Sequence, residues 1–421
     1  MLYCMHLKRF PLTRKGIVMT FFTKYVHPVI VLFASIIFWG LSVLVQKFSE
    51  RRVILIYSYI APRSDTKHLV DKLQKSCVSG DIVVVSRAEI ATDVTSPNLD
   101  HVAFVAYGSI RHALYSLFAR VVITTHGIPV FSPNAKYIFL WHGIPLKSIN
   151  WAFRKSTRIP YYKRIALLRL HFFEKNIVVV SPSRLYSLLL AYSFRLYNAY
   201  FLEVGHPRYD YLATSPKDLS DVFSHCADCQ FIASSDKRVI LYLPTFRDNA
   251  LGEDGFHEYL STVRTLSKIC SSVGFTLLSV PHPFLSVFFG NRDYIQVGDR
   301  AFVFSPRALD PYDLFSVSDI LITDYSSVFF DFLYLGKPII FYVPDLEEYS
   351  KERGFFLEPF DVWTPGPKVR NPEELRRVLE ELSAGVDPYA CKRKVFREIF
   401  LTYADQDSTE RIVRLIKDFL G

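Results

Sequence analysis

Two histidines in this sequence of 421 residues have neighbours that suit proton transfer at a loop. His142 follows a hydrophobic run and precedes Gly143, where the backbone can turn sharply. His282 lies between Pro281 and Pro283, which fix the backbone on both sides of the imidazole. Histidine is the side chain best matched to general base catalysis near neutral pH. Taken singly, a histidine in such a position is more often an ordinary loop residue. Both are nevertheless candidates for catalysis.

Hydroxyl and guanidinium groups that suit phosphate binding follow two other hydrophobic runs. Thr245 and Arg247 follow the first of these runs. Asp324 follows the second and precedes Ser326 and Ser327, which stand at the start of an apolar helical stretch. A serine there is a natural N-cap, and the free N–H groups of a helix N-terminus bind phosphate. Two histidines, an arginine and a serine pair at strand ends together indicate a site for a phosphorylated ligand.

The elements that must position these residues alternate between short β-branched runs and helical stretches from Val53 onward, a pattern typical of parallel sheets with helices on both faces. The strands expected in the first half are Val53–Ile60, Ile82–Ser86, Val102–Ala106, Val121–Thr125, Tyr137–Trp141 and Ile177–Ser181. Those expected in the second half are Val239–Leu243, Phe275–Val280, Ala301–Phe304, Ile320–Thr323 and Pro338–Val343. Ligands of open α/β sheets bind at the carboxyl ends of strands, so the candidate residues would meet in a cleft between two doubly wound domains.

The division into domains follows from a polar stretch, Ser215–Lys237, between the two halves. We expect an N-terminal segment over residues 1–50, a first domain over 51–236 and a second over 237–421. The second domain should become helical from Pro372 and end in an amphipathic helix over Ser408–Leu420.

Charge is distributed unevenly along the chain. The formal net charge is +9, but residues 1–215 carry 27 Lys and Arg against 10 Asp and Glu, whereas residues 216–421 carry 23 against 31. No Asp or Glu occurs from His101 to Phe173, where ten Lys and Arg are interleaved with aromatic residues. This acid-free segment suits an anionic bilayer surface, and a solvated basic face is as consistent with it. Nucleic acid is not expected, because no helix-turn-helix, zinc-finger or RNA-recognition motif is present.

The N-terminal segment contains a long apolar run. Tyr25–Val45 holds no Asp, Glu, Lys or Arg over 21 residues. At ~1.5 Å per residue, that length can cross a ~30 Å hydrocarbon core. We predict a membrane helix here, and a buried helix or one lying in a single leaflet is the alternative. Lys24 before the run and Lys47 and Arg51 after it make both flanks basic, so charge gives no orientation.

Seven segments resemble the CDP-glycerol glycerophosphotransferase family of teichoic acid primases and polymerases. They are WHGIPLK (141–147), GHPRYD (205–210), YLPTFRD (242–248), PHP (281–283), SDILITDYSSVFFDFLYLGKPIIFY (318–342), DLEEYSKERGFF (345–356) and TPGP (364–367). They occur in the order typical of the family, and the block over 318–342 is long and specific. Two positions depart from the family pattern: Tyr209 stands where Asn is usual, and Gln406 stands where Gly usually follows the aspartate.

The resemblance implies a GT-B-like fold whose second domain holds the nucleotide donor and whose first domain faces the acceptor and the membrane. It implies that His142 is the general base and that His282 faces the reacting phosphate. The donor and its phosphates would be bound by Thr245, Arg247, Asp324, Ser326, Ser327 and Arg411. The acceptor side would be formed by Gly143, Lys147 and Arg208.

The implied reaction transfers a glycerol phosphate or related polyol phosphate unit from a CDP-alcohol to a lipid-linked acceptor and releases CMP. It would serve teichoic-acid-like or capsular polymer synthesis, with the catalytic domains on the cytoplasmic side of the cell membrane. A glycosyltransferase that uses a nucleotide sugar and a non-catalytic membrane adaptor are the alternatives. No cofactor and no metal are expected, since the C-x-x-C pair Cys226 and Cys229 lacks a second pair with zinc spacing.

Overall fold

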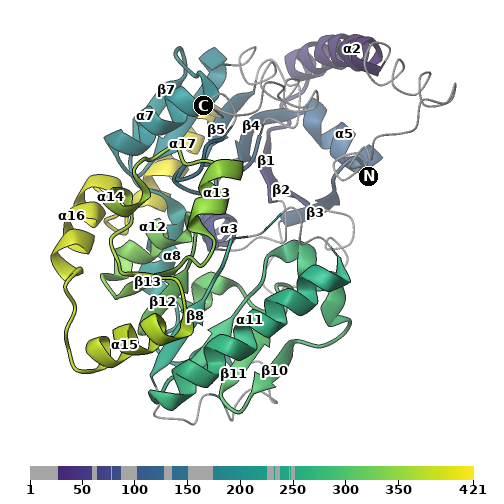
Figure 1. Cartoon of the computed structure of the whole chain (residues 1–421). Coiled ribbons are helices and arrows are strands. Elements are labelled where there is room, and N and C mark those ends of the chain that lie inside the picture. Colours follow the sequence, from purple (N-terminus) through teal and green to yellow (C-terminus); the bar gives the residue numbers. More distant parts are fainter. Residues whose placement is uncertain are drawn as a thin grey trace, which may run out of the picture.

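The computed structural model describes residues 27–58, 64–76, 78–86, 102–127, 135–149, 174–224, 232, 238–245, 247 and 252–421 (Figure 1). Side chains are described from residue 37 in the first helix and from residue 66 in the second. The Cys226–Cys229 pair and the part of the acid-free segment over residues 150–173 lie outside this range.

The first half of the chain forms a seven-stranded parallel sheet in the order β3-β2-β1-β4-β5-β6-β7. Its strands are β1 Val53–Tyr57, β2 Asp81–Ser86, β3 Val102–Ala106, β4 Ala119–Thr124, β5 Lys136–Phe139, β6 Ile177–Ser181 and β7 Tyr200–Glu203. Strands β1 and β6 are buried along their whole length, as expected for apolar runs in a sheet covered on both faces. The strand order changes direction between β1 and β4, which creates a crevice at their carboxyl ends.

The second half repeats this architecture in the order β10-β11-β9-β8-β12-β13-β14, and only β10 and β11 pair antiparallel. Its strands are β8 Val239–Tyr242, β9 Thr276–Ser279, β10 Tyr294–Gly298, β11 Ala301–Phe304, β12 Ile320–Thr323, β13 Ile339–Tyr342 and β14 Lys368–Val369. The direction of strand order changes between β8 and β12. The expected α/β fold with two doubly wound, parallel sheets is confirmed.

Helices cover the sheets and join the two halves. They are α2 His27–Phe48, α3 Ser64–Lys75, α5 Ile110–Leu117, α7 Arg184–Phe194, α8 Pro207–Thr214, α9 Leu219–Val222, α11 Glu253–Ser272, α12 Val328–Phe332, α13 Leu346–Glu352, α14 Phe360–Trp363, α15 Pro372–Ser383, α16 Ala390–Phe400 and α17 Ser408–Leu420. The largest apolar cluster contains Leu55 and Val122 of the first sheet together with Leu241 and Leu321 of the second. The halves therefore share a continuous core.

The C-terminal helix α17 packs on the first half, although it follows the second in sequence. Ile412, Val413 and Ile416 are fully buried in the apolar cluster beneath the first sheet. Asp210 of α8 accepts hydrogen bonds from the backbone N–H groups of Ser408, at 3.3 Å, and Thr409, at 2.6 Å, and so caps α17. A boundary at 236/237 thus separates α17 from the sheet that it covers.

Helix α2 lies against the first half, above α5 in Figure 1. The Gln46 side-chain amide donates to the carbonyl oxygens of Leu117 and Ala119 at 3.0 Å, and Ser42 is buried beside it. The predicted membrane run Tyr25–Val45 begins outside the described residues. Among the residues that are described, no helix has the length and apolar character needed to cross a bilayer.

Candidate active site

The carboxyl ends of β8 and β12 bring together two of the segments chosen from the sequence. Thr245 and Asp324 follow these neighbouring strands, at the point where the strand order of the second sheet changes direction. The Thr245 backbone N–H donates to Asp324 Oδ1 at 2.7 Å, and the Tyr325 N–H donates to the same oxygen at 2.5 Å. Asp324 therefore fixes the segments that follow β8 and β12. Ligands of open α/β sheets bind at such a point, where the strand order changes direction.

His142 lies two residues after Leu140, which hydrogen-bonds to the end of β4. Its Nδ1 lies 3.0 Å from the carbonyl oxygen of Thr125, and its ring stacks on that of His126 with 4.5 Å between centroids. A carbonyl oxygen only accepts, so Nδ1 carries the proton and donates it. In this tautomer Nε2 is the nitrogen that carries the lone pair, as a general base requires.

Gly143 is required for a close approach between the two halves. A Cβ atom at this position would lie 2.8 Å from Ser327 Oγ, closer than such atoms pack. The backbone bends at His142 and Gly143, as expected, and Trp141 just before them has a left-handed φ of 55°. The segment that carries the candidate base therefore contacts the start of α12 directly.

Lys147 also crosses between the halves. It pairs with Phe355 in an isolated antiparallel bridge, and the Phe356 N–H donates to the Leu146 carbonyl at 2.8 Å. Burial raises the pKa of Asp324, while Thr245, Arg247 and Lys147 oppose that shift by favouring the carboxylate. Lys147, which the resemblance assigns to the acceptor side, therefore lies close enough to Asp324 of the second half to favour its charged form.

Arg247 is held by carboxylates of the second half. Its guanidinium bonds both oxygens of Asp345, at 2.5 and 3.2 Å, and lies 3.6 Å from Asp324. The Arg247 guanidinium also lies over the rings of Tyr325 and Tyr349, which stack on each other at 3.9 Å. These contacts fix the guanidinium at the strand ends, where it can face a phosphate.

The serine pair precedes α12, as the sequence indicated. Ser326 Oγ accepts from the Val328 N–H at 3.4 Å, whereas Ser327 makes no capping hydrogen bond with its side chain. Ser326 is therefore the residue whose hydroxyl supports the turn, and Ser327 contacts the Gly143 segment.

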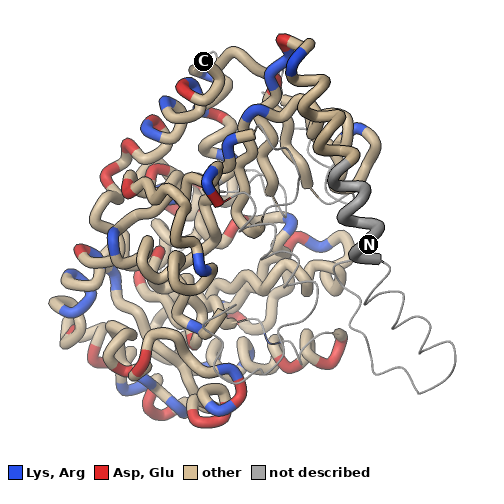
Figure 2. The backbone as a smooth tube through the Cα atoms, turned by 90° about the horizontal axis from the view of Figure 1, so that it is seen from above, with Lys and Arg blue, Asp and Glu red and all other residues tan. Residues whose placement is uncertain are grey.

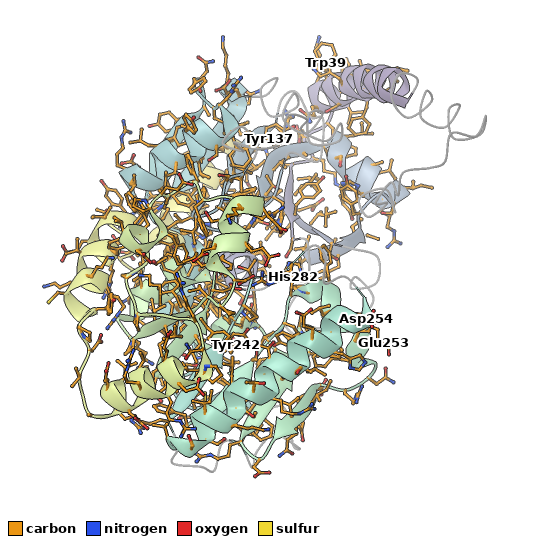
Figure 3. All side chains as sticks on the ribbon, in the orientation of Figure 1. Trp39, Tyr137, Tyr242, Glu253, Asp254 and His282 are labelled. Atoms are coloured by element: carbon orange, nitrogen blue, oxygen red, sulfur yellow. The ribbon has the colours of Figure 1, made fainter. Side chains whose placement is uncertain are left out.

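His282 and Arg411 have different surroundings from these residues. His282 is exposed on the second half, where Figure 3 labels it, and its Nδ1 accepts from the Phe284 N–H at 3.3 Å. Because Nδ1 accepts, the proton of the neutral ring is on Nε2. Arg411 bonds the carboxylate of Asp405 and the Val204 carbonyl, at 3.1 Å for the latter, so its recorded contacts attach α17 to the first half.

Three residues of this region were not selected from the sequence as site residues. His126 directly follows an expected strand, as His142 does, so the strand-end argument could have found it. Asp345 stands at the start of α13, in the segment 345–356 that resembles the family, whereas Tyr312 stands in a 3-10 helix over Pro311–Leu314 that no sequence pattern marked. Within the described ranges, no group of three or more His, Cys, Asp and Glu residues is placed to hold a metal ion.

Comparisons with known proteins identify the family and the fold of this chain. Residues 42–418 match the family described as CDP-Glycerol:Poly(glycerophosphate) glycerophosphotransferase. The chain is 32% identical over 284 residues to a teichoic acid poly(glycerol phosphate) polymerase of Bacillus spizizenii, covering 65% of this chain and 68% of that protein. It is 29% identical over 296 residues to a teichoic acid glycerol-phosphate transferase of Staphylococcus aureus, covering 68% and 72%. The structure of the wall teichoic acid polymerase TagF superposes with a TM-score of 0.72 at 24% identity, over 96% of this chain and 98% of that one.

Proposed function

Because the chain belongs to the CDP-glycerol:poly(glycerophosphate) glycerophosphotransferase family, we propose that it transfers glycerol phosphate, or a related polyol phosphate, from a CDP-alcohol to a lipid-linked acceptor. It is a teichoic acid polyol-phosphate transferase of that family. The proposal adds the donor, the acceptor and the role of each residue.

The reaction needs a base, positively charged groups beside the phosphate and a leaving group. The oxygen of the acceptor hydroxyl bonds to the β-phosphorus of the donor, and its proton passes to Nε2 of His142. The bond between that phosphorus and the bridging oxygen breaks, and CMP leaves with the bonding electrons. Arg247, Lys147 and His282 offset the negative charge that develops on the phosphate oxygens.

One observation carries this assignment. The hydrogen bond from Nδ1 of His142 to Thr125 makes Nε2 the basic nitrogen of the ring, and Gly143 lies against Ser327 at the start of α12. The base therefore stands beside the element on which the donor phosphates are proposed to rest.

A donor comparison tests the proposal. Purified protein with a lipid-linked glycerol phosphate acceptor would be given CDP-glycerol, CDP-ribitol or a UDP-sugar, and nucleotide release and product mass would be measured. We expect CMP release and a product heavier by one polyol phosphate unit. UDP release with sugar transfer would instead support the glycosyltransferase alternative, and no release from any donor would support the adaptor.

We also propose that the protein works on the cytoplasmic face of the cell membrane, because nucleotide-activated alcohols are made in the cytoplasm. On α2, Trp39, Leu44 and Phe48 are exposed, and the described part of this helix carries no Asp or Glu (Figures 2 and 3). An apolar helix face with basic neighbours such as Lys47 and Arg51 suits an anionic bilayer surface.

Cysteine labelling tests the orientation. Cys391 on α16 is an exposed free thiol. A membrane-impermeant maleimide should label Cys391 in lysed cells but not in intact cells, and Cys391→Ser identifies its signal among the cysteines. Labelling of Cys391 in intact cells would place the catalytic half outside.

A further inference from the structure

A buried ion pair joins the two halves directly beneath the candidate base. Arg208 at the start of α8 and Asp331 on α12 lie 3.0 Å apart, and each side chain is only 3% exposed. They come from positions 123 residues apart in the chain. A narrow gap beside this pair is lined by Gly143, Tyr209 and other residues of the first half and by Asp331 of the second.

The same guanidinium holds the backbone on which His142 stands. Arg208 donates to the carbonyl oxygens of Trp141 and His142, at 3.2 Å each. Trp141 has the left-handed φ of 55°, a conformation that a bulky residue adopts only when its surroundings impose it. Arg208 therefore supports the strained turn that aims the His142 ring.

His206 completes this support on the first half. Arg208 Nε donates to His206 Nδ1 at 3.2 Å, so the proton of that imidazole is on Nε2, which donates to the Leu140 carbonyl at 3.0 Å. The carbonyl groups of residues 140 to 142 are thus all hydrogen-bonded. His206, just before α8, bonds the first, and Arg208 on α8 bonds the other two.

Asp331 is fixed just as firmly, by one tyrosine from each half. Tyr312 donates to Asp331 Oδ2 at 2.6 Å, and Tyr209 donates to Oδ1 at 2.9 Å. Asp331 lies one helical turn beyond Ser327, the residue that contacts Gly143. A displacement of α12 would therefore move both Ser327 and the carboxylate that anchors Arg208.

We propose that Asp331, with Tyr209 and Tyr312, is a positioning group that acts through Arg208 to align His142 with the donor phosphates on α12. The inference rests on the proposed function, since it names the residues that set the geometry of the same site. None of the three touches the reacting atoms. Their effect is to make the orientation of the base depend on the position of the donor-binding helix.

The contact pattern favours positioning over stability alone. A buried ion pair is weak evidence for net stabilisation, because desolvation of both charges offsets their attraction. Arg208 also donates hydrogen bonds to two carbonyl oxygens of the strained turn. Asp331 accepts hydrogen bonds from two tyrosine hydroxyls, which fix the orientation of its carboxylate. A displacement of a catalytic group by about 1 Å lowers the reaction rate by about 100-fold.

The test compares Asp331→Asn, Tyr209→Phe and Tyr312→Phe with the wild-type enzyme, measuring kcat per folded molecule and the dissociation constant of the donor. The donor is whichever nucleotide compound the wild-type protein uses. We expect kcat to fall about 10-fold or more for Asp331→Asn and less for each tyrosine variant, with the dissociation constant changed by no more than about twofold.

Asp387→Asn is the matched control. Asp387, in the loop before α16, pairs with Arg393 on α16; the arginine side chain is 2% exposed and the aspartate side chain 24% exposed. We expect the control to lower the unfolding temperature without changing kcat per folded molecule. If Asp331→Asn behaves in the same way as the control, the pair is structural and the inference is wrong.

A second readout does not depend on turnover. The nitrogen resonances of His142, assigned with His142→Ala, report its tautomer and ring environment. Asp331→Asn and Tyr209→Phe should shift them, whereas Asp387→Asn should not. Unchanged His142 resonances in Asp331→Asn would overturn the inference. Absence of CMP release by the wild-type protein would contradict only the proposed donor.

Discussion

At the scale of single residues, hydrogen bonds decide which candidate can act as a base. His142 donates from Nδ1 to Thr125, so its Nε2 carries the lone pair, whereas His282 accepts at Nδ1 from its own loop, so its Nε2 carries the proton. The two histidines stand on opposite halves of the molecule. Their effects on turnover and on donor binding should differ for that reason.

His142→Ala should lower turnover by about 10²–10⁴-fold while donor affinity changes little, because the base acts on the acceptor hydroxyl. His282→Ala should slow the reaction and also weaken donor binding, because it faces the phosphate. Steady-state rates and calorimetry with CDP-glycerol measure the two effects. Loss of donor binding in His142→Ala but not in His282→Ala would reverse the two roles.

Gly143→Ala tests the close approach of the two halves. The added methyl group would lie 2.8 Å from Ser327 Oγ, so either the Ser327 hydroxyl rotates away or the base moves relative to α12. We expect turnover to fall by up to about 100-fold with an intact fold by circular dichroism. Gly127→Ala is the control, since nothing lies within 4 Å of a Cβ atom there. Equal activity of the two variants would show that the contact is not needed.

At the scale of elements, capping and buried polar contacts fix where helices begin and how they sit on the sheets. His112 on α5 illustrates this. It accepts from the Gly108 N–H at 3.1 Å, and its Nε2 lies 2.7 Å from the Tyr57 hydroxyl at the end of β1. Burial lowers the pKa of His112 from 6.5 to about 4, so the folded state holds this ring neutral.

The low pKa of His112 predicts acid sensitivity. Between pH 6.5 and 4 the unfolded chain binds a proton at His112 that the folded chain does not. The contribution of neutral His112 to the free energy of unfolding is therefore full above pH 6.5 and is lost as the pH falls toward 4. The loss should reach about 3 kcal/mol. His112→Gln removes this titration, so the stability difference between wild type and variant, measured by urea unfolding, should shrink as pH falls. A difference independent of pH would contradict the assignment.

At the scale of the whole molecule, contacts distant in sequence join the two halves into one body. The apolar core runs from the first sheet into the second, and α17 returns from the end of the chain to cover the first sheet (Figure 1). Beside the site, the first half contacts the second through Arg208, Gly143 and Lys147. The relative position of the halves is therefore set by packing around the base itself.

Ile416→Ala should destabilise the first half although residue 416 lies at the end of the chain. Ile416 is fully buried against the first sheet, and removing such a side chain costs about 2–5 kcal/mol. Denaturant unfolding measures the loss, and Lys417→Ala, at an exposed position of α17, is the control. An effect no larger than that of the control would mean that α17 does not contribute to the core.

The strands and the residues that follow them could be predicted from the sequence. Ile177–Ser181, Ala301–Phe304 and Ile320–Thr323 form strands with the expected bounds, because an apolar β-branched run between polar turns carries its own signal. The strands β7, β10 and β14 were missed. β14 has only two residues, and β7 and β10 are partly exposed and mix polar with apolar side chains, so their local pattern is weak.

Only the tertiary structure decided which of the candidate residues meet. Lys147 acts on Asp324, Arg208 pairs with Asp331, and Arg411 bonds Val204. These partners are separated by more than 100 residues, so no local spacing encodes them. The sequence determined what chemistry stands at each strand end, since strand formation is local. The packing of two sheets against each other determined the partners, because that packing is a property of the whole chain.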